Sequence, residues 1–116
     1  MKKINIKIRV SNGFETVIGP GKADLLQHII DTGSISAAAK KMNMSYRRAW
    51  ELINTMNQSF DEPIVIAKTG GIHGGGAELS DFGIKILNLY KVLIQKMLAT
   101  VDEEITQINS HLKSWK

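Results

Sequence analysis

Residues 34–60 constrain this chain more than any other segment, because they are typical of two helices joined by a tight turn. The sequence predicts a short alanine-rich helix that opens at Ser36, which we expect to be its N-cap. That helix stops at residues 42–44, and a second helix begins at Ser45, its expected N-cap. Two short helices around such a turn indicate a helix-turn-helix, and this motif favours DNA binding.

The second helix is predicted to be amphipathic. Its apolar residues recur at three- and four-residue steps and form one stripe: Ala49, Leu52, Ile53, Met56 and Phe60. Arg47, Glu51, Asn54 and Gln58 fall on the opposite face. Helix-turn-helix proteins insert the N-terminal part of their second helix into the major groove. We therefore expect this polar face to enter DNA.

The residues around the turn carry a charge that suits a polyanion. Four of the residues from 40 to 48 are basic and none is acidic. The predicted DNA contacts in this unit are Ser36, Lys40, Lys41, Ser45, Tyr46, Arg47, Arg48 and Asn54. The alternative is that the two helices are common core architecture and that their charges only solvate a face.

A glycine-rich segment follows the two helices. Residues 64–67 form a short β-branched run, residues 69–76 contain five glycines, and residues 77–79 can return as a second strand. This pattern predicts a β-hairpin with a long tip, a wing, in which glycine permits close approach to a partner. The predicted contacts are Lys68, Thr69, Gly70, Gly71 and His73. A nucleotide-binding loop would need a Lys-Ser/Thr pair after the glycines, which this segment lacks, whereas a loop without any partner stays possible.

The first part of the chain predicts another β-hairpin and a helix. Isoleucine and valine alternate with polar residues over 4–10, which places Lys7 and Arg9 on the polar face. Asn12-Gly13 is a strong turn signal, and residues 14–18 can pair back. A helix is expected over about 22–32, with inward residues Leu25, Leu26, Ile29 and Ile30 and with Gly33 as its cap.

Residues 81–116 predict one long helix with Ser80 as its N-cap. Ten positions at alternating three- and four-residue steps form a seam, and nine of them are apolar, Lys91 being the exception. Such a seam favours a second helix, so we predict a homodimer. The predicted interface residues are Ile84, Leu87, Ile94, Leu98, Val101, Ile105, Ile108 and Leu112. The alternative is a break near Thr100 after which the helix folds back onto its own domain.

Composition excludes several function classes. The chain has no cysteine, which excludes disulfides and thiolate metal sites. Its three histidines lie in different segments without ligand spacing, and no nucleophile stands beside a base. We therefore expect no enzyme activity, no metal and no cofactor. No apolar run reaches the length of a membrane span and no signal peptide is recognisable, so we expect a cytoplasmic protein with no membrane partner.

These residues carry a resemblance to a known family. The motifs are Gly33–Ser36 with Ala38-Ala39, then Met44–Trp50 and Met56-Asn57, then the wing residues Thr69–Gly71, Gly74–Ala77, Leu79-Ser80 and Phe82-Gly83. From about residue 20 to about residue 90 the chain resembles the N-terminal winged-helix domain of the molybdate-responsive transcription regulators, the ModE family. Similarity to the LysR-type regulators is weaker, because they share the Gly-Ser and Ala-Ala positions without this wing.

The resemblance implies the DNA-binding half of such a regulator, which is dimeric in the family. Full-length ModE members continue into domains that bind molybdate or tungstate, and no molybdate site is expected in residues 1–116. The sequence thus predicts an α+β, mainly α fold, with a winged helix-turn-helix over 1–80 and a dimerisation helix over 81–116.

The predicted function is a transcription regulator that binds a two-fold symmetric operator on double-stranded DNA as a homodimer. The alternative is a protein-interaction module that uses the same scaffold without reading bases.

Overall fold

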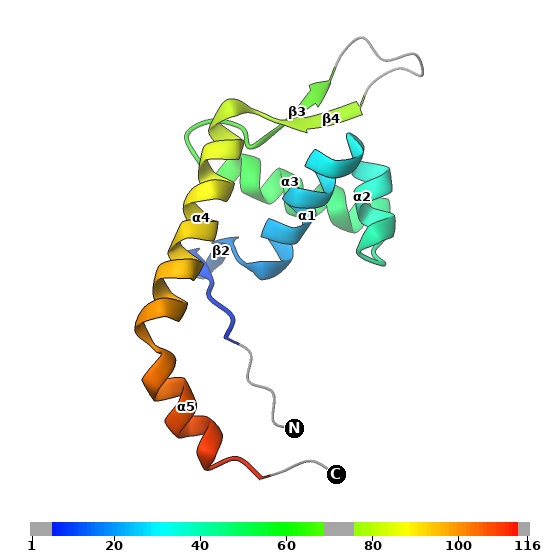
Figure 1. Cartoon of the computed structure of the whole chain (residues 1–116). Helices are drawn as coiled ribbons and strands as arrows, with labels where there is room; N and C mark the ends of the chain where they lie inside the picture. The colour runs from blue at the N-terminus through cyan, green and yellow to red at the C-terminus, as the bar shows by residue number, and fades with distance from the viewer. Residues whose placement is uncertain (1–5, 69–75, 114–116) are drawn as a thin grey trace.

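The structure is a computed structural model that describes residues 6–68 and 76–113. Within these ranges it contains five helices and two small antiparallel sheets, which confirms the mainly α prediction (Figure 1). The elements are β1 (Val10–Asn12), β2 (Glu15–Ile18), α1 (Pro20–Thr32), α2 (Ile35–Lys41), α3 (Tyr46–Ser59), β3 (Val65–Lys68), β4 (Gly76–Leu79), α4 (Asp81–Thr100) and α5 (Asp102–Ser110). None of these helices is long and apolar enough to cross a membrane.

Helix α1 lies at the centre of the helical unit and supplies much of its core. It begins at Pro20, two residues before the predicted start, because proline suits the first helical turn, where no N–H donor is needed. Gly33 caps it as predicted, in the left-handed conformation with φ 72°. Leu25, Leu26 and Ile29 are fully buried. The inward prediction for Ile30 is wrong, because the next helical position turns about 100° away from Ile29 and Ile30 is exposed.

The N-cap of α2 differs from the prediction. Ser34, not Ser36, is extended and accepts a hydrogen bond from the Ala37 N–H at 3.1 Å. The physical reason is the left-handed turn at Gly33, after which the next residue already holds its hydroxyl against the free first-turn N–H groups. Ser36 therefore lies inside the first turn of α2, with an exposed side chain.

The turn between α2 and α3 has the tight geometry that the sequence predicts. Asn43 adopts a left-handed conformation with φ 54°, and the Met44 N–H donates to the Ala39 carbonyl at 3.0 Å. Ser45 caps α3 as predicted, accepting from the Arg48 N–H at 3.0 Å. The buried side chains at the crossing are small: Ala38, Ala39 and Ala49. The two helices can therefore pack closely.

The wing is a two-stranded sheet whose base rests on the helices. β3 pairs with β4 in the register Val65↔Leu79 to Lys68↔Gly76, within one residue of the predicted strands. The Ala77 N–H donates to the Gly33 carbonyl at 3.0 Å. A Cβ on Gly76 would lie only 2.6 Å from that same carbonyl oxygen, so glycine is needed where the wing crosses the α1–α2 junction.

The N-terminal hairpin forms, but its first strand is shorter than predicted. β1 and β2 are joined by the predicted Asn12-Gly13 turn, in which Gly13 has φ 64°. The strand prediction for residues 6–9 is wrong, because the pairing register shifts between Val10 and Ser11 and the ladder ends there. Instead, the Tyr90 hydroxyl donates to the Ile8 carbonyl at 2.6 Å and ties this segment to α4.

The C-terminal prediction of one helix is wrong, since α4 ends at Thr100 and α5 begins at Asp102. Three acidic residues occupy the first turn of α5, where they favour a new helix N-terminus over the middle of a helix. The Thr100 hydroxyl also donates back to the Lys96 and Met97 carbonyls, which competes with continued helix. The alternative of a break is therefore right, yet α5 extends away from the helical unit and does not fold back onto it (Figure 1).

Candidate nucleic-acid interface

The first turn of α3 presents its polar side chains to solvent. Tyr46, Arg47 and Arg48 are exposed, and the Arg47 side chain is 91% accessible. The opposite stripe packs into the core as predicted, with Ala49, Ile53 and Met56 buried. Of the other residues on the polar face, Glu51 and Gln58 are exposed and Asn54 is half-buried. The predicted reading face is therefore free to meet a partner.

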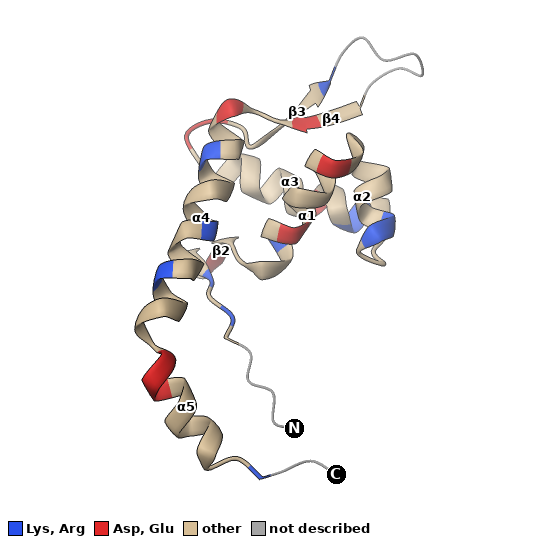
Figure 2. Ribbon diagram, in the orientation of Figure 1, with Lys and Arg blue, Asp and Glu red and all other residues tan. Residues whose placement is uncertain are grey.

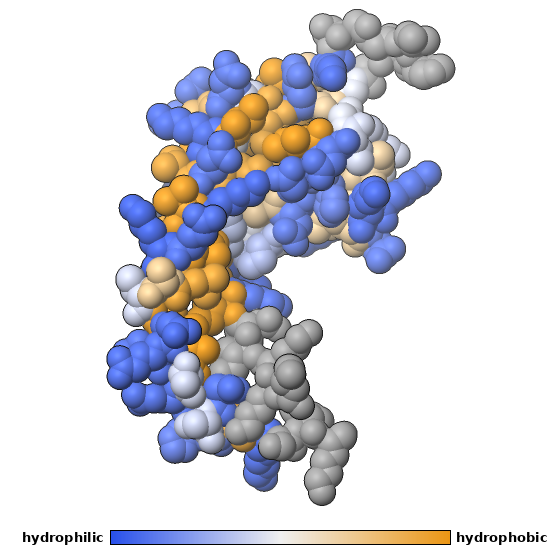
Figure 3. Space-filling view, viewed as in Figure 1, coloured by the Kyte–Doolittle hydropathy of each residue, from blue (hydrophilic) through white to orange (hydrophobic). Residues whose placement is uncertain are grey.

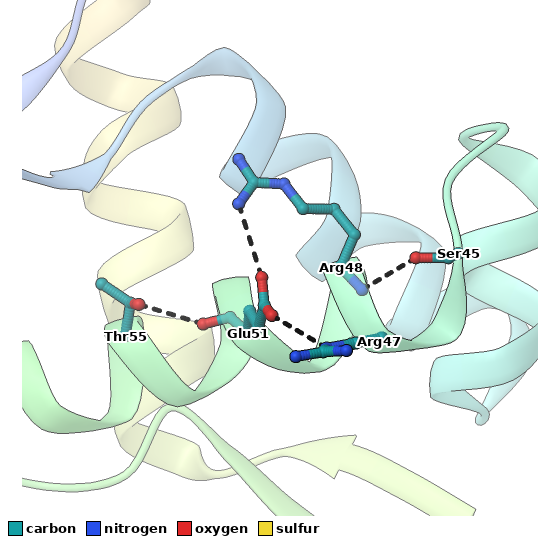
Figure 4. Close-up of polar contacts among 5 residues, drawn as sticks. All are labelled: Ser45, Arg47, Arg48, Glu51 and Thr55. Atoms are coloured by element: carbon teal, nitrogen blue, oxygen red, sulfur yellow. Dashed lines mark hydrogen bonds and ion pairs between the residues drawn. The ribbon is translucent and has the colours of Figure 1, made fainter.

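Glu51 links the two arginines of this turn. Its carboxylate lies 3.4 Å from Arg47 Nε and 3.9 Å from an Arg48 terminal nitrogen (Figure 4). All three side chains are at least half exposed, so each ion pair contributes at most about a few tenths of a kcal/mol to the free energy of unfolding. Such weak pairs leave both arginines accessible to solvent. The three- and four-residue spacing is the sequence signal for this pairing, which sequence reasoning did not use.

The wing lies along one flank of α3, and Asn57 holds it there. The Asn57 side-chain carbonyl accepts from the Ile64 and Val65 N–H groups at 2.8 and 3.0 Å, and its amide donates to the Val65 carbonyl at 3.1 Å. These hydrogen bonds of Asn57, which we call the Asn57 clamp, fix the start of β3 relative to α3, the reading helix. Lys68 is exposed at the other end of β3. The predicted contacts Thr69, Gly70, Gly71 and His73 lie outside the described residues.

The N-terminal hairpin lies along the other flank of α3. A hollow of about 550 Å³ separates them, with Phe14 and Glu15 on the hairpin side and Arg48 and Asn54 on the helix side. Lys22 reaches into it and donates to the Thr16 carbonyl. Burial lowers the pKa of Lys22; Glu15 opposes this effect and Arg48 adds to it. Sequence reasoning did not single out Lys22, because nothing local relates it to α3.

Two further predicted contacts lie at the end of α2. Lys40 and Lys41 occupy its last turn and are exposed, where positive charge also favours the helix C-terminus. Figure 2 shows them as a basic patch on α2, beside the turn that leads into α3. Trp50 was not among the predicted contacts, although it is half exposed on α3.

The predicted dimer residues divide into three groups by their burial. Leu87 is buried in the core of its own chain and is unavailable to a partner. This assignment is corrected by the structure, because the seam turns inward where α4 packs on the helical unit. Ile84, Leu98, Ile108 and Leu112 are exposed. Ile94, Val101 and Ile105 are half-buried. Apolar side chains cover much of the visible face of α4 (Figure 3).

Comparison with known proteins gives a consistent result. The lysR family of bacterial regulatory helix-turn-helix proteins matches residues 22–83. The chain is 45% identical over 76 residues to the DNA-binding transcriptional dual regulator ModE of Escherichia coli (strain K12), covering 66% of this chain and 29% of that protein. It is 40% identical over 96 residues to the transcriptional regulator ModE of Yersinia pestis, covering 80% of this chain and 36% of that protein.

The molybdenum transport protein ModE of Azotobacter vinelandii is 36% identical over 94 residues, which cover 81% of this chain and 35% of that protein. The chain thus spans about a third of the length of these relatives.

Solved structures share the fold at low sequence identity. The crystal structure of the CbnR_DBD-DNA complex superposes with a TM-score of 0.57 at 15% identity, covering 76% of this chain and 95% of that chain. ArgP from Mycobacterium tuberculosis superposes with a TM-score of 0.53 at 19% identity, covering 77% of this chain and 32% of that chain. The fold is therefore the winged helix-turn-helix of LysR-type DNA-binding domains.

Proposed function

Because the chain belongs to the lysR family of bacterial regulatory helix-turn-helix proteins, we propose that it regulates transcription by binding a two-fold symmetric operator as a homodimer. Its relatives from Escherichia coli and Yersinia pestis are named as transcriptional regulators. Bacterial DNA lies in the cytosol, which is accordingly where this protein acts.

The exposed first turn of α3 is the observation that carries this proposal. The Arg47 side chain is 91% accessible, held only by a weak pair with Glu51, on a helix whose other face is fixed in the core. Arginine is suited to guanine because its two parallel N–H donors match the O6 and N7 acceptors in the major groove. We assign base reading to Arg47, Asn54 and Glu51, whose carboxylate can accept from the cytosine amino group.

Phosphate contacts are assigned to the residues that surround this turn. Ser36, Lys40 and Lys41 lie on α2, Ser45 and Tyr46 open α3, and Lys68 ends β3. Backbone contacts of this kind set the orientation of a protein on the duplex without reading its sequence. The wing residues Thr69, Gly70, Gly71 and His73 stay part of the proposal from sequence alone.

The second part of the proposal is the dimer. Leu98, Ile108 and Leu112 are large apolar residues whose side chains no other part of the described chain covers fully. Two copies that pair through this seam would place their α3 helices about a two-fold axis. Reading heads related in this way match half-sites about one helical turn of DNA, or about 34 Å, apart.

A gel-shift experiment tests the proposal. The protein is mixed with genomic fragments and with a mixed-sequence duplex competitor, at a low and a moderate salt concentration. The affinity of non-specific complexes falls steeply as the salt concentration rises, so they dissociate, whereas specific complexes persist. Retention of a small set of fragments at the higher salt is expected. Uniform loss of all fragments would contradict sequence-specific binding.

A protein-interaction module is the second candidate function. The exposed seam on α4 and α5 favours it, because such a surface can pair with a different chain as well as with a second copy. This candidate predicts no fragment selection in the gel shift. It also predicts a monomer when the purified protein is sedimented alone.

A further inference from the structure

A basic cleft lies between the N-terminal segment and the start of α3, away from the wing. Its volume is about 290 Å³, and it is lined by Lys7, Arg9, Lys22 and Arg48 together with uncharged residues. Among the residues that the structure describes, no acidic side chain lines it. We call it the N-terminal cleft.

The residues of the N-terminal cleft come together because alternate side chains of residues 6–9 point to different sides. Ile6 and Ile8 line a separate hollow with Tyr90 and Ile94, against α4 and α1. Lys7 and Arg9 line the cleft next to Arg48. The hydrogen bond from Tyr90 to the Ile8 carbonyl holds this segment in place between the two hollows. The alternation predicted from sequence therefore survives without a regular strand.

Gly19 allows the Arg9 side chain to pack closely against the backbone. A Cβ placed on Gly19 would lie 3.2 Å from Arg9 Cγ and 3.7 Å from Thr16 Cγ2. The aliphatic stem of Arg9 therefore lies directly over Gly19, and its guanidinium extends beyond that contact. This packing positions the start of the Arg9 side chain at the edge of the cleft.

The positive charges in the N-terminal cleft are only partly compensated: Glu51 pairs with Arg48, and the charge of Glu15 acts on Lys22. Among the described residues, the ion pairs within 4.0 Å are those of Glu51 with Arg47 and Arg48. Lys7 and Arg9 therefore face the cleft without a paired carboxylate among the described residues, and an anion between them would reduce their mutual repulsion. Lys7 and Arg9 are exposed, so an anion can reach them without deep desolvation.

We propose that the N-terminal cleft binds the sugar–phosphate backbone of the DNA duplex, beside the major groove that α3 enters. The inference rests on the proposed function and adds a second backbone contact to it. The wing and Lys68 lie on one flank of α3, and the cleft lies on the other. A major groove about 12 Å wide is bordered by one phosphate row on each side. The reading helix is thus held between two contacts, one for each row.

The test compares the salt dependence of DNA binding in two charge-matched variants. Lys7→Gln with Arg9→Gln removes two charges from the cleft. Lys96→Gln with Lys113→Gln removes two charges from exposed positions on the last turns of α4 and after α5. Each protein is titrated with a mixed-sequence duplex over a range of salt concentrations, and circular dichroism checks the fold. A charge-preserving variant, Lys7→Arg with Arg9→Lys, controls for side-chain shape.

The slope of log K against log salt should become shallower by about one to two units in the cleft variant. The slope should stay at the wild-type value in the Lys96→Gln, Lys113→Gln control and in the charge-preserving variant. An unchanged slope in the cleft variant, with DNA binding otherwise intact, overturns the cleft and leaves the proposed function standing. Wild-type protein that binds no duplex at any salt concentration overturns both.

A titration with inorganic phosphate in the absence of DNA separates the duplex backbone from a small free anion. If the wild type binds phosphate, the cleft variant does not, and both have the same salt slope on DNA, the cleft serves a free oxyanion and the proposal fails. Loss of phosphate binding together with the shallower slope supports the backbone contact.

Discussion

Two regions of this molecule differ in how far their apolar side chains are buried. In the winged head, formed by β1 to β4, α1 to α3 and the first half of α4, residues such as Leu25, Leu26 and Ile64 are fully buried. In the C-terminal arm, formed by residues 95–113, Leu98 is 45% exposed, Ile108 is 60% exposed, and α5 has no buried residue. The head completes its core within one chain. The arm has the periodicity of a packed helix and lacks the packing.

This difference shows that periodicity reports only that a face is apolar. Leu87 and Leu98 both belong to the same predicted seam, yet the first is buried in the core of the head and nothing in the described chain fully covers the second. The surface that buries such a face depends on where the helix lies in space. The following predictions test whether the arm is completed by a second copy.

The largest effect is expected from charge in the arm. Leu98→Glu together with Ile108→Glu should abolish dimerisation, because burying each parent side chain in an interface is worth about 1.5–3 kcal/mol. Sedimentation should show a monomer, while circular dichroism shows an intact head. The control carries Leu89→Glu and Val92→Glu, two exposed apolar residues on the other side of α4, and should sediment like the wild type. A wild type that is already monomeric at micromolar concentration contradicts the dimer.

A cavity in the head should be the next largest effect. Leu26→Ala removes a fully buried side chain and should lower the free energy of unfolding by about 2–5 kcal/mol. Denaturant titration should give the same loss at every protein concentration, because the surroundings of Leu26 are intramolecular. For Ile108→Ala the loss should shrink on dilution. Equal behaviour of the two variants would remove the distinction between head and arm.

A smaller effect is expected at the reading helix. Arg47→Ala should weaken binding to a selected fragment by about 1–3 kcal/mol if Arg47 forms two hydrogen bonds with a guanine. Binding to mixed-sequence DNA should change much less, which fluorescence anisotropy can measure side by side. An equal loss on both duplexes would make Arg47 a phosphate contact. Stability should be nearly unchanged, since Arg47 is exposed and its pair with Glu51 is weak.

The smallest effect is expected at the wing. Lys68→Ala should weaken binding to all sequences alike and reduce the salt slope by about one unit, the signature of one lost phosphate contact. The preference for the selected fragment should survive. If neither affinity nor slope changes in a salt titration, β3 and β4 only support the head.

Local features were predictable from the sequence because each depends on few neighbouring residues. Ser45 and Ser80 cap their helices as expected, through bonds to the Arg48 and Gly83 N–H groups. Gly33 ends α1, and Asn12-Gly13 turns the first hairpin. In each case the residue type alone satisfies a free backbone group or permits a positive φ.

Features that depend on competition or on distance were not predictable. Ser34 and Ser36 are both good N-caps, and only the turn at Gly33 decides between them. The α4–α5 break reflects acidic residues at a new helix start that override a continuous seam. The N-terminal cleft unites positions 7, 9, 22 and 48, which no sequence spacing connects. The Asn57 clamp on β3 is likewise a tertiary contact.

The most direct test of the paired-head architecture is a footprint of the protein on a DNA fragment that it binds at the higher salt concentration. We predict two protected segments whose sequences are related by two-fold symmetry, with centres about 34 Å or a multiple of that distance apart. Each protected segment corresponds to one α3 helix of the pair, and Leu98→Glu with Ile108→Glu should remove both at the same protein concentration. A single protected segment, or protection that persists in the monomeric variant, would contradict the paired-head architecture.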